Sequence, residues 1–112
     1  MLHVAAAASR LSAMKPRVGA AAVRGGRIIA IGYNRAGSSK QARDAWSRHA
    51  EVTACLRADL RGATMYVYRE HGLTGEPLLA RPCKSCWAVM RAAGVRRVVF
   101  TTAGGQADYN ID

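Results

Sequence analysis

The sequence predicts a single α/β domain, residues 1–112, in which helices cover both faces of a mixed sheet of four or five strands. Three observations lead to this fold class. Two nearly continuous apolar runs flank a Gly-Gly pair near the N-terminus, which is typical of a hairpin covered on both faces. Further along the chain, segments with apolar residues at helical spacing alternate with short apolar runs. Half of the 112 residues are hydrophobic, which is enough for one core.

The N-terminal part contains a helix and a hairpin. Met1–Lys15 is alanine-rich and lacks acidic residues, as some targeting peptides do. Apolar residues nevertheless recur at helical spacing in this segment, at Val4, Ala8, Leu11 and Met14. We therefore expect a structural helix. Val18–Val23 and Ile28–Tyr33 are the two apolar runs, and Gly25-Gly26 lies in the turn between them.

The remaining elements alternate between helix and strand. A helix is expected over His49–Leu60, where Val52, Leu56 and Leu60 have helical spacing, and a strand over Thr64–Tyr68. The segment Glu70–Arg81 contains Gly and Pro and is expected to be a long loop. It leads to a helix over Lys84–Ala93, which Gly94 ends, and then to a strand over Val98–Thr102.

The short C-terminal tail restricts the direction of any fifth strand. About ten residues follow Thr102, whereas a parallel strand needs a crossover of about a dozen or more. A fifth strand, Ala107–Ile111, must therefore be antiparallel to the fourth, unless another chain supplies it.

Two short segments carry groups that could hold a metal ion and use it. One contains His49 and Glu51, and the other is Pro82-Cys83-Lys84-Ser85-Cys86. Zinc prefers thiolate and imidazole ligands, and a catalytic zinc keeps its fourth position for water. Cys83 and Cys86 have a spacing that lets both sulfurs reach one ion from the first turn of a helix. The Glu51 carboxylate, two residues after His49, could approach the water without being a ligand.

Each segment alone has a simpler interpretation. A lone Cys-x-x-Cys could be a redox pair or half of a structural zinc site, and a lone His-x-Glu is most often a solvated helix start. A structural zinc domain would need a fourth protein ligand, but Cys55, His3 and His71 belong to no second paired motif. The two segments together favour a catalytic metal site.

Both segments, in this order and with Pro82 before the first Cys, match the His-x-Glu and Pro-Cys-x-x-Cys signature of zinc deaminases. The chain resembles the cytidine deaminase-like superfamily, which includes cytidine, deoxycytidylate and tRNA adenosine deaminases. The similarity runs from about Val18 to Thr102. It implies a three-layer α-β-α fold of the cytidine deaminase type and assembly into a homo-oligomer.

The resemblance also implies roles for individual residues. His49, Cys83 and Cys86 would bind Zn²⁺, and Glu51 would be the catalytic proton carrier. By the same resemblance, Asn34 contacts the sugar or base and the Ala50 backbone N–H binds the base carbonyl; for Asn34 a plain turn position is the alternative.

The expected reaction is hydrolytic deamination of a cytosine base to uracil, in a free nucleoside or nucleotide of cytidine or deoxycytidine. One alternative is a deaminase that acts on cytosine or adenine in single-stranded DNA or RNA. Another is a zinc-binding module of the same fold without turnover, although such a module has no need of Glu51.

The charge of the chain bears on its partners. Seventeen Lys and Arg against seven Asp and Glu leave a formal charge of +10, which attracts polyanions. Several basic residues are expected to border the cavity and could grip a phosphate: Arg35, Lys40, Arg43, Arg48, Arg81 and Lys84. Nucleic acid thus stays open as a partner beside a small-molecule nucleotide. A merely arginine-rich soluble domain is the alternative.

Cysteine content and hydropathy indicate the compartment. Three cysteines, two of them in the metal motif, argue against a disulfide scaffold and predict a cytoplasmic protein. No apolar stretch approaches the roughly twenty residues that cross a bilayer, so no membrane partner is expected. Cys55 is interpreted as a small buried residue. Trp46 and Trp87 could stack on a base or serve packing, and Tyr109 could close the cavity or pack within a strand.

Overall fold

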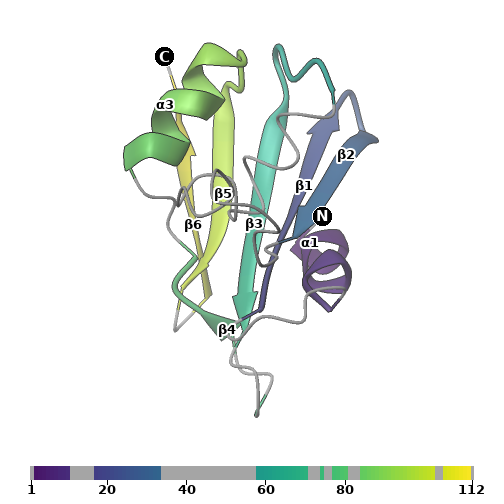
Figure 1. The fold of residues 1–112 in the computed structure, drawn as a ribbon, viewed down its shortest axis with the longest axis vertical. Helices are drawn as coiled ribbons and strands as arrows, with labels where there is room; N and C mark the ends of the chain where they lie inside the picture. The colour runs from purple at the N-terminus through teal and green to yellow at the C-terminus, as the bar shows by residue number, and fades with distance from the viewer. Residues whose placement is uncertain are drawn as a thin grey trace, which may run out of the picture.

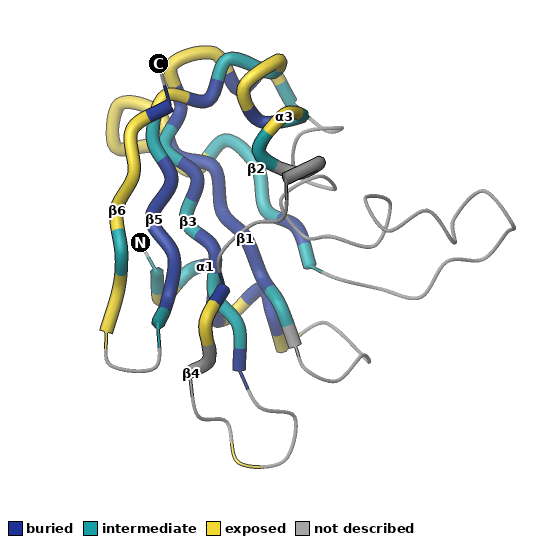
Figure 2. The backbone as a smooth tube through the Cα atoms, turned by 90° about the vertical axis from the view of Figure 1, so that its left-hand side faces the viewer, coloured by how far each residue is buried: buried dark blue, intermediate teal, exposed yellow. Residues whose placement is uncertain are grey.

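A mixed β-sheet organises the chain in the computed structural model, which describes residues 2–10, 17–33, 58–70, 74, 77–80, 84–102 and 105–111. The strands follow the order β2-β1-β3-β5-β6, and a short strand β4 pairs with β3 (Figure 1). Helices α1 and α3 lie on opposite faces of this sheet (Figure 2). The predicted three-layer α/β fold with a mixed sheet is confirmed. No helix in the described ranges is long and apolar enough to span a bilayer.

The predicted hairpin is confirmed. Strands β1 (Arg17–Arg24) and β2 (Arg27–Tyr33) pair antiparallel, with a register shift after Ala22. Gly25 and Gly26 form the turn with φ values of 59° and 78°. Only glycine adopts two successive positive φ values at little cost, which explains why this dipeptide closes the hairpin.

The C-terminal half forms a parallel crossover followed by one antiparallel strand. Strand β3 (Thr64–Glu70) runs parallel to β5 (Arg97–Thr102), and α3 (Lys84–Ala92) connects them. Strand β6 (Gly105–Asn110) then pairs antiparallel with β5. The predicted direction of the last strand is therefore confirmed, and this chain supplies the strand itself.

Two predicted boundaries were wrong. The expected helix over His49–Leu60 does not reach Leu60, because residues 58–60 are not helical. Instead the Leu60 carbonyl accepts a turn hydrogen bond from the Ala63 N–H at 2.9 Å, and its side chain is fully buried. The apolar spacing at Leu60 thus reflected burial in a turn. Residues 49–57 of that expected helix lie outside the described residues.

The expected long loop Glu70–Arg81 is shorter than predicted. Strand β3 continues to Glu70, and Pro77–Leu78 form β4, which pairs antiparallel with Arg69 and Glu70. Pro77 is compatible with strand structure here because β4 is a two-residue strand that pairs only with β3.

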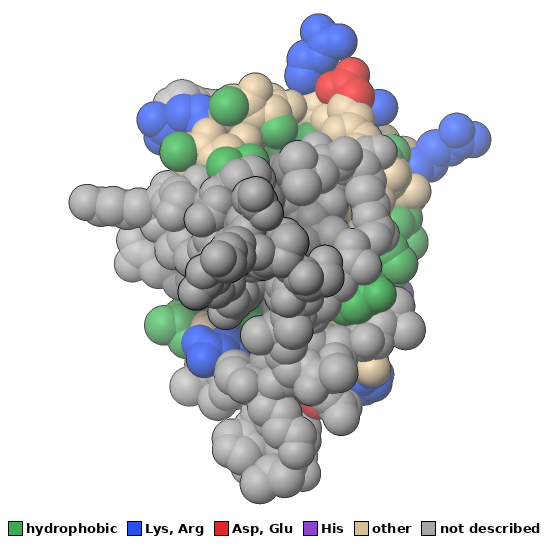
Figure 3. Space-filling view, in the orientation of Figure 1, with side chains coloured by type: hydrophobic (Ala, Val, Ile, Leu, Met, Phe, Trp, Pro, Cys, Tyr) green, Lys and Arg blue, Asp and Glu red, His purple; other side chains and the backbone are tan. Residues whose placement is uncertain are grey.

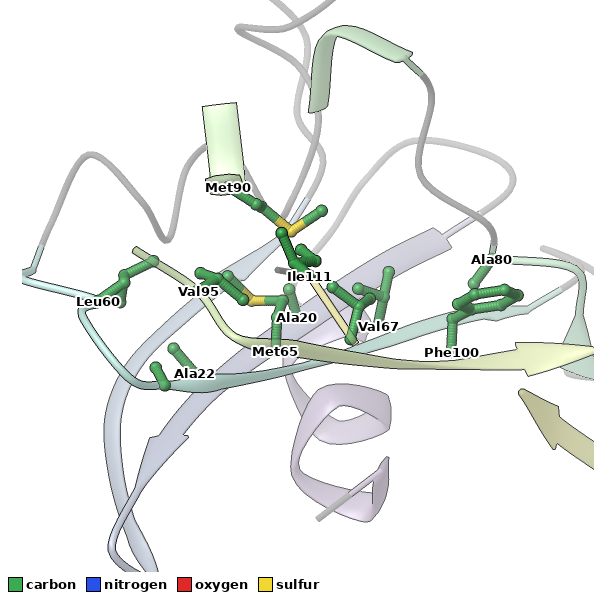
Figure 4. Close-up of a cluster of buried hydrophobic side chains, with 12 residues drawn as sticks. Ala20, Ala22, Leu60, Met65, Val67, Ala80, Met90, Val95, Phe100 and Ile111 are labelled. Atoms are coloured by element: carbon green, nitrogen blue, oxygen red, sulfur yellow. The ribbon is translucent and has the colours of Figure 1, made fainter. Parts of the chain in front are cut away.

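The main hydrophobic core lies between the sheet and α3. Alternate residues of β3 and β5 point to this side, among them Met65, Val67 and Val98, and Met90 of α3 reaches down to them (Figure 4). All four of these side chains are essentially inaccessible to solvent. In the same view α1 lies beyond the opposite face of the sheet.

Helix α1 (Leu2–Ser9) packs on the other face through small residues. Its buried positions are Ala5, Ala6, Ala8 and Ser9. The predicted helix is confirmed over these residues. Of its predicted apolar face, Ala8 is buried and Val4 is half-buried. Positions 11 and 14 lie outside the described residues. The alanine-rich face lets α1 approach β1 closely at Gly19.

A surface ion pair ties β6 to β5. The Arg97 guanidinium donates two hydrogen bonds to the Asp108 carboxylate, through Nε to Oδ1 at 2.7 Å and through Nη2 to Oδ2. These bonds lower the pKa of Asp108 and raise that of Arg97. Because the folded pKa of Asp108 is depressed, the stabilisation is present at neutral pH and is lost as the pH falls through that folded pKa.

We therefore expect Asp108→Asn to lower the free energy of unfolding slightly at pH 7. The difference between the two proteins should shrink below about pH 4, where an unfolded Asp becomes protonated, and in high salt. Urea unfolding of both proteins at pH 7 and pH 3 measures this difference in the free energy of unfolding. A difference that grows on acidification would contradict this role for the pair.

Candidate active site

The strands that precede the predicted site residues end at one edge of the sheet. Strand β2 ends at Tyr33, which pairs with Gly19 of β1, and Gly19 pairs with Tyr68 near the end of β3. The carboxyl ends of β2, β3 and β5 therefore face the same way, at the lower edge in Figure 1. Ligands in open α/β sheets characteristically bind beside the carboxyl ends of parallel strands.

Helix α3 points its first turn toward this part of the sheet. At its far end the Gly94 carbonyl accepts a hydrogen bond from the Gly62 N–H at 2.8 Å, just before β3 begins. Since α3 runs back against the direction of β3 and β5, its N-terminus faces the half of the sheet where those strands end. Cys86 is in this first turn, and Cys83 directly precedes the helix.

Three hydrogen bonds near the end of β3 position the chain that leads to α3. The Ala80 N–H donates to the Thr101 carbonyl at 2.9 Å, and the Arg69 guanidinium donates to the Leu79 carbonyl at 3.3 Å. The Arg69 N–H also donates to Thr101 Oγ1 at 3.3 Å. Ala80 is thereby fixed beside the end of β5. Cys83 follows three residues later, within a chain reach of about 10 Å.

Among the predicted site residues, Cys86 is the one that lies in a described helix or strand. Cys86 belongs to α3, but its side chain is not among those described. The other predicted site residues lie outside the described residues: Asn34, His49, Ala50, Glu51 and Cys83. Within the described ranges no three His, Cys, Asp or Glu side chains form a metal-binding group. Asn34 directly follows Tyr33, the last residue of β2. Tyr33 and the start of α3 lie toward the same half of the sheet.

The donor set fits zinc. Two thiolates and an imidazole are ligands that zinc prefers, and they leave a fourth position open. The first turn of α3 contains no acidic residue. The partial positive charge of a helix N-terminus favours the thiolate form of cysteines placed there.

A buried carboxylate on the opposite face anchors the end of β3. Glu70 is 4% exposed, and its Oε1 lies 3.1 Å from the Ser9 hydroxyl and 3.8 Å from Arg10 Nε. Burial, and secondarily the Glu70 charge, raise the pKa of Tyr68. The sequence had placed Glu70 in a loop, so this anchor between α1 and β3 was missed. A periodic pattern offers no signal for it.

Aromatic residues near α3 serve packing. Trp87 meets the ring of Tyr109 edge-on, with centroids 6.2 Å apart, and Tyr109 stacks on Phe100 at 5.6 Å. These contacts favour the packing interpretation of Trp87 and Tyr109. His3 is exposed on α1, as predicted for a residue outside the metal site.

Comparison with known proteins agrees with this arrangement. Residues 1–102 match the family model described as the cytidine and deoxycytidylate deaminase zinc-binding region. A deoxycytidylate deaminase of Mycobacterium phage D29 is 32% identical over 120 aligned positions, which cover 85% of each chain.

Solved structures share the fold. A cytidine deaminase from Burkholderia pseudomallei superposes with a TM-score of 0.70 at 25% identity, over 97% of this chain and 88% of that one. The dCMP deaminase from cyanophage S-TIM5, in complex with dCMP and dUMP, superposes with a TM-score of 0.63 at 23% identity, over 88% and 76% of the two chains. The sheet order and the placement of α3 agree with the family match over residues 1–102. The chain therefore belongs to the cytidine and deoxycytidylate deaminase family.

Proposed function

We propose that this chain is a zinc-dependent hydrolase that converts the cytosine of a free nucleotide, deoxycytidylate, to uracil. The observation that carries the proposal is the conjunction of the His-x-Glu and Pro-Cys-x-x-Cys motifs with a family match over 102 residues. The choice of a deoxynucleotide is supported by the 32% identity to a deoxycytidylate deaminase.

Each site residue has a defined task in this proposal. His49, Cys83 and Cys86 hold the metal, with Cys86 positioned by the first turn of α3. Zinc, when bound, lowers the pKa of a coordinated water to about 7. Glu51 would accept a proton from the water and deliver it to the ring nitrogen. It would then carry a second proton, from the hydroxyl group added to the ring, to the departing amine. The balanced reaction consumes one water and yields deoxyuridylate and ammonia.

Substrate positioning falls to the segment that follows β2 and to the residues just before α3. Asn34 follows the last residue of β2 and binds the sugar or base, while the Ala50 N–H binds the base carbonyl. Basic residues of the same segments, such as Arg43 and Arg81, would hold the phosphate. Their positions lie outside the described residues, so their part in the proposal depends on the sequence and the family.

A substrate panel tests the proposal. Zinc-loaded protein is incubated with deoxycytidylate, cytidylate, deoxycytidine, cytidine and a single-stranded oligonucleotide that contains cytosine, and ammonia release is followed. We expect the highest kcat/KM with deoxycytidylate, because among the free compounds only that substrate offers both the phosphate and the deoxyribose.

Two outcomes would contradict the proposal. Absence of ammonia release from every free cytosine compound would exclude a deaminase of free nucleotides. Release from the oligonucleotide alone would favour nucleic acid as the substrate, which the formal charge of +10 makes the second candidate.

A further inference from the structure

A pocket lies at the end of the sheet away from the predicted metal site. It has a volume of about 470 Å³, and its walls come from the β1–β2 turn, the beginnings of β3 and β5, and the end of β6. The six residues of α3 that follow Cys86, roughly 9 Å of helix, lead from the first turn toward this end of the sheet.

The pocket has a strongly basic lining. Arg24, Arg96 and Arg97 contribute to its walls, and among the described residues no Asp or Glu does. Figure 3 shows Lys and Arg side chains projecting from this end of the molecule, drawn uppermost, beside an acidic side chain. The acidic residues nearby, Asp59 and Asp108, are engaged by Arg61 and Arg97.

Two of the three arginines form no ion pair with a carboxylate in the described part of the chain. Arg24 donates from one guanidinium nitrogen to the carbonyls of Asp59 at 3.2 Å and Arg61 at 3.1 Å. Carbonyl acceptors orient a guanidinium but leave its positive charge intact. Arg96 is exposed, and in the described part of the chain no carboxylate forms an ion pair with it.

Neutral hydrogen-bonding groups complete the lining. Tyr66, Thr64 and Asn110 face the same recess, and Asn110 is opposite Arg97 in the β5–β6 ladder. The rim at Gly25 and Gly26 carries no side chain, and a Cβ added at either position would meet no atom within 4 Å. A ligand can therefore approach the backbone directly at this rim.

We propose that this pocket binds a phosphate-bearing small anion at a site separate from the deaminase centre. Guanidinium groups bind phosphate oxygens through paired hydrogen bonds, and three neighbouring arginines, of which Arg24 and Arg96 form no ion pair in the described part of the chain, match such a ligand. The volume lies in the range of small-molecule sites, about 300–1,000 Å³. Because the cations surround a recess, a compact phosphate ligand fits better than an extended strand.

Binding of inorganic pyrophosphate to the zinc-loaded full chain tests this site by calorimetry. We expect saturable binding that Arg96→Gln weakens by tenfold or more. Arg91→Gln is the matched control, since Arg91 is also an exposed arginine but lies on α3 and does not line the pocket. It removes the same charge and should change the affinity less than twofold.

A second pair of variants keeps the test independent of Arg96. Asn110→Asp places a carboxylate in the pocket and should weaken pyrophosphate binding by tenfold or more. Gln106→Glu adds the same charge on the same face of β6, outside the lining, and should have little effect.

Four results would overturn the proposal. The first is the absence of saturable binding by the unmodified chain, and the second is an affinity that neither pocket variant changes. The third is an equal loss of affinity in the control variants, which would assign binding to the overall charge. The fourth is tight binding of an oligonucleotide that Arg91→Gln and Arg96→Gln weaken alike, which would also assign binding to the overall charge. Since the measurement needs no turnover, its outcome is independent of the proposed deaminase activity.

Discussion

Replacement of Glu51 by Gln is expected to lower kcat for deamination by about 10²–10⁴-fold while the zinc content stays near one ion per chain. Glutamine has nearly the same shape but cannot accept and return a proton, so the transfer to the ring and the amine is lost. Steady-state assays with deoxycytidylate and metal analysis of the same preparation measure both quantities.

Cys86→Ser provides the informative comparison. It removes a thiolate from the first turn of α3 and should reduce zinc content and activity together, since a hydroxyl is a poor ligand for zinc. Cys55→Ser changes the cysteine outside the metal motif and should leave the zinc content unchanged. If Glu51→Gln also lost its zinc, Glu51 would be a metal ligand and its assignment as the proton carrier would be wrong.

Gly19→Ala is expected to destabilise the protein by about 3 kcal/mol or more, at the upper end of the cost of overpacking. A Cβ at this position would lie 2.0 Å from the Ala5 carbonyl oxygen and 2.4 Å from the Ser9 nitrogen. Both are backbone atoms of α1, so no side chain can rotate away. The helix would have to move off β1, which would also disturb the contact between Ser9 and Glu70.

Urea unfolding followed by circular dichroism measures this change, and Gly25→Ala is its control. Gly25 has a φ of 59°, and a Cβ there would meet nothing within 4 Å. Alanine at that turn should cost only about 1–2 kcal/mol, from the backbone conformation alone. Equal losses in the two variants would show that the approach of α1 to Gly19 is not the tight contact described above.

The elements with strong local signals could be predicted from the sequence. Gly25-Gly26 between two apolar runs predicted the hairpin, and Gly94 after an apolar-periodic segment predicted the end of α3. The antiparallel direction of β6 was predicted because only a short segment with two glycines, Ala103–Gln106, separates the predicted last strand from the preceding one. These features depend on residues close together in the sequence.

Features that depend on distant partners could not be predicted. Leu60 had helical spacing with Leu56, yet it occupies a turn, and its side chain is buried in the core. Strand β4 forms only because β3 lies beside Pro77–Leu78. The buried face of α1 is decided by Gly19, whose missing side chain admits the helix backbone. In each case the local pattern is compatible with several structures, and a contact far along the chain selects one of them.

For the function the same division holds. The residue types at 49, 51, 83 and 86, and their spacing, determine by themselves the chemistry that this protein can support, because ligand preference and proton transfer are properties of side chains. Only the tertiary structure decided that the end of β2 and the first turn of α3 face one half of the sheet. It alone also gathered Arg24, Arg96 and Arg97 into one pocket at the other end, since the pairing of β1, β3 and β5 brings together positions more than seventy residues apart.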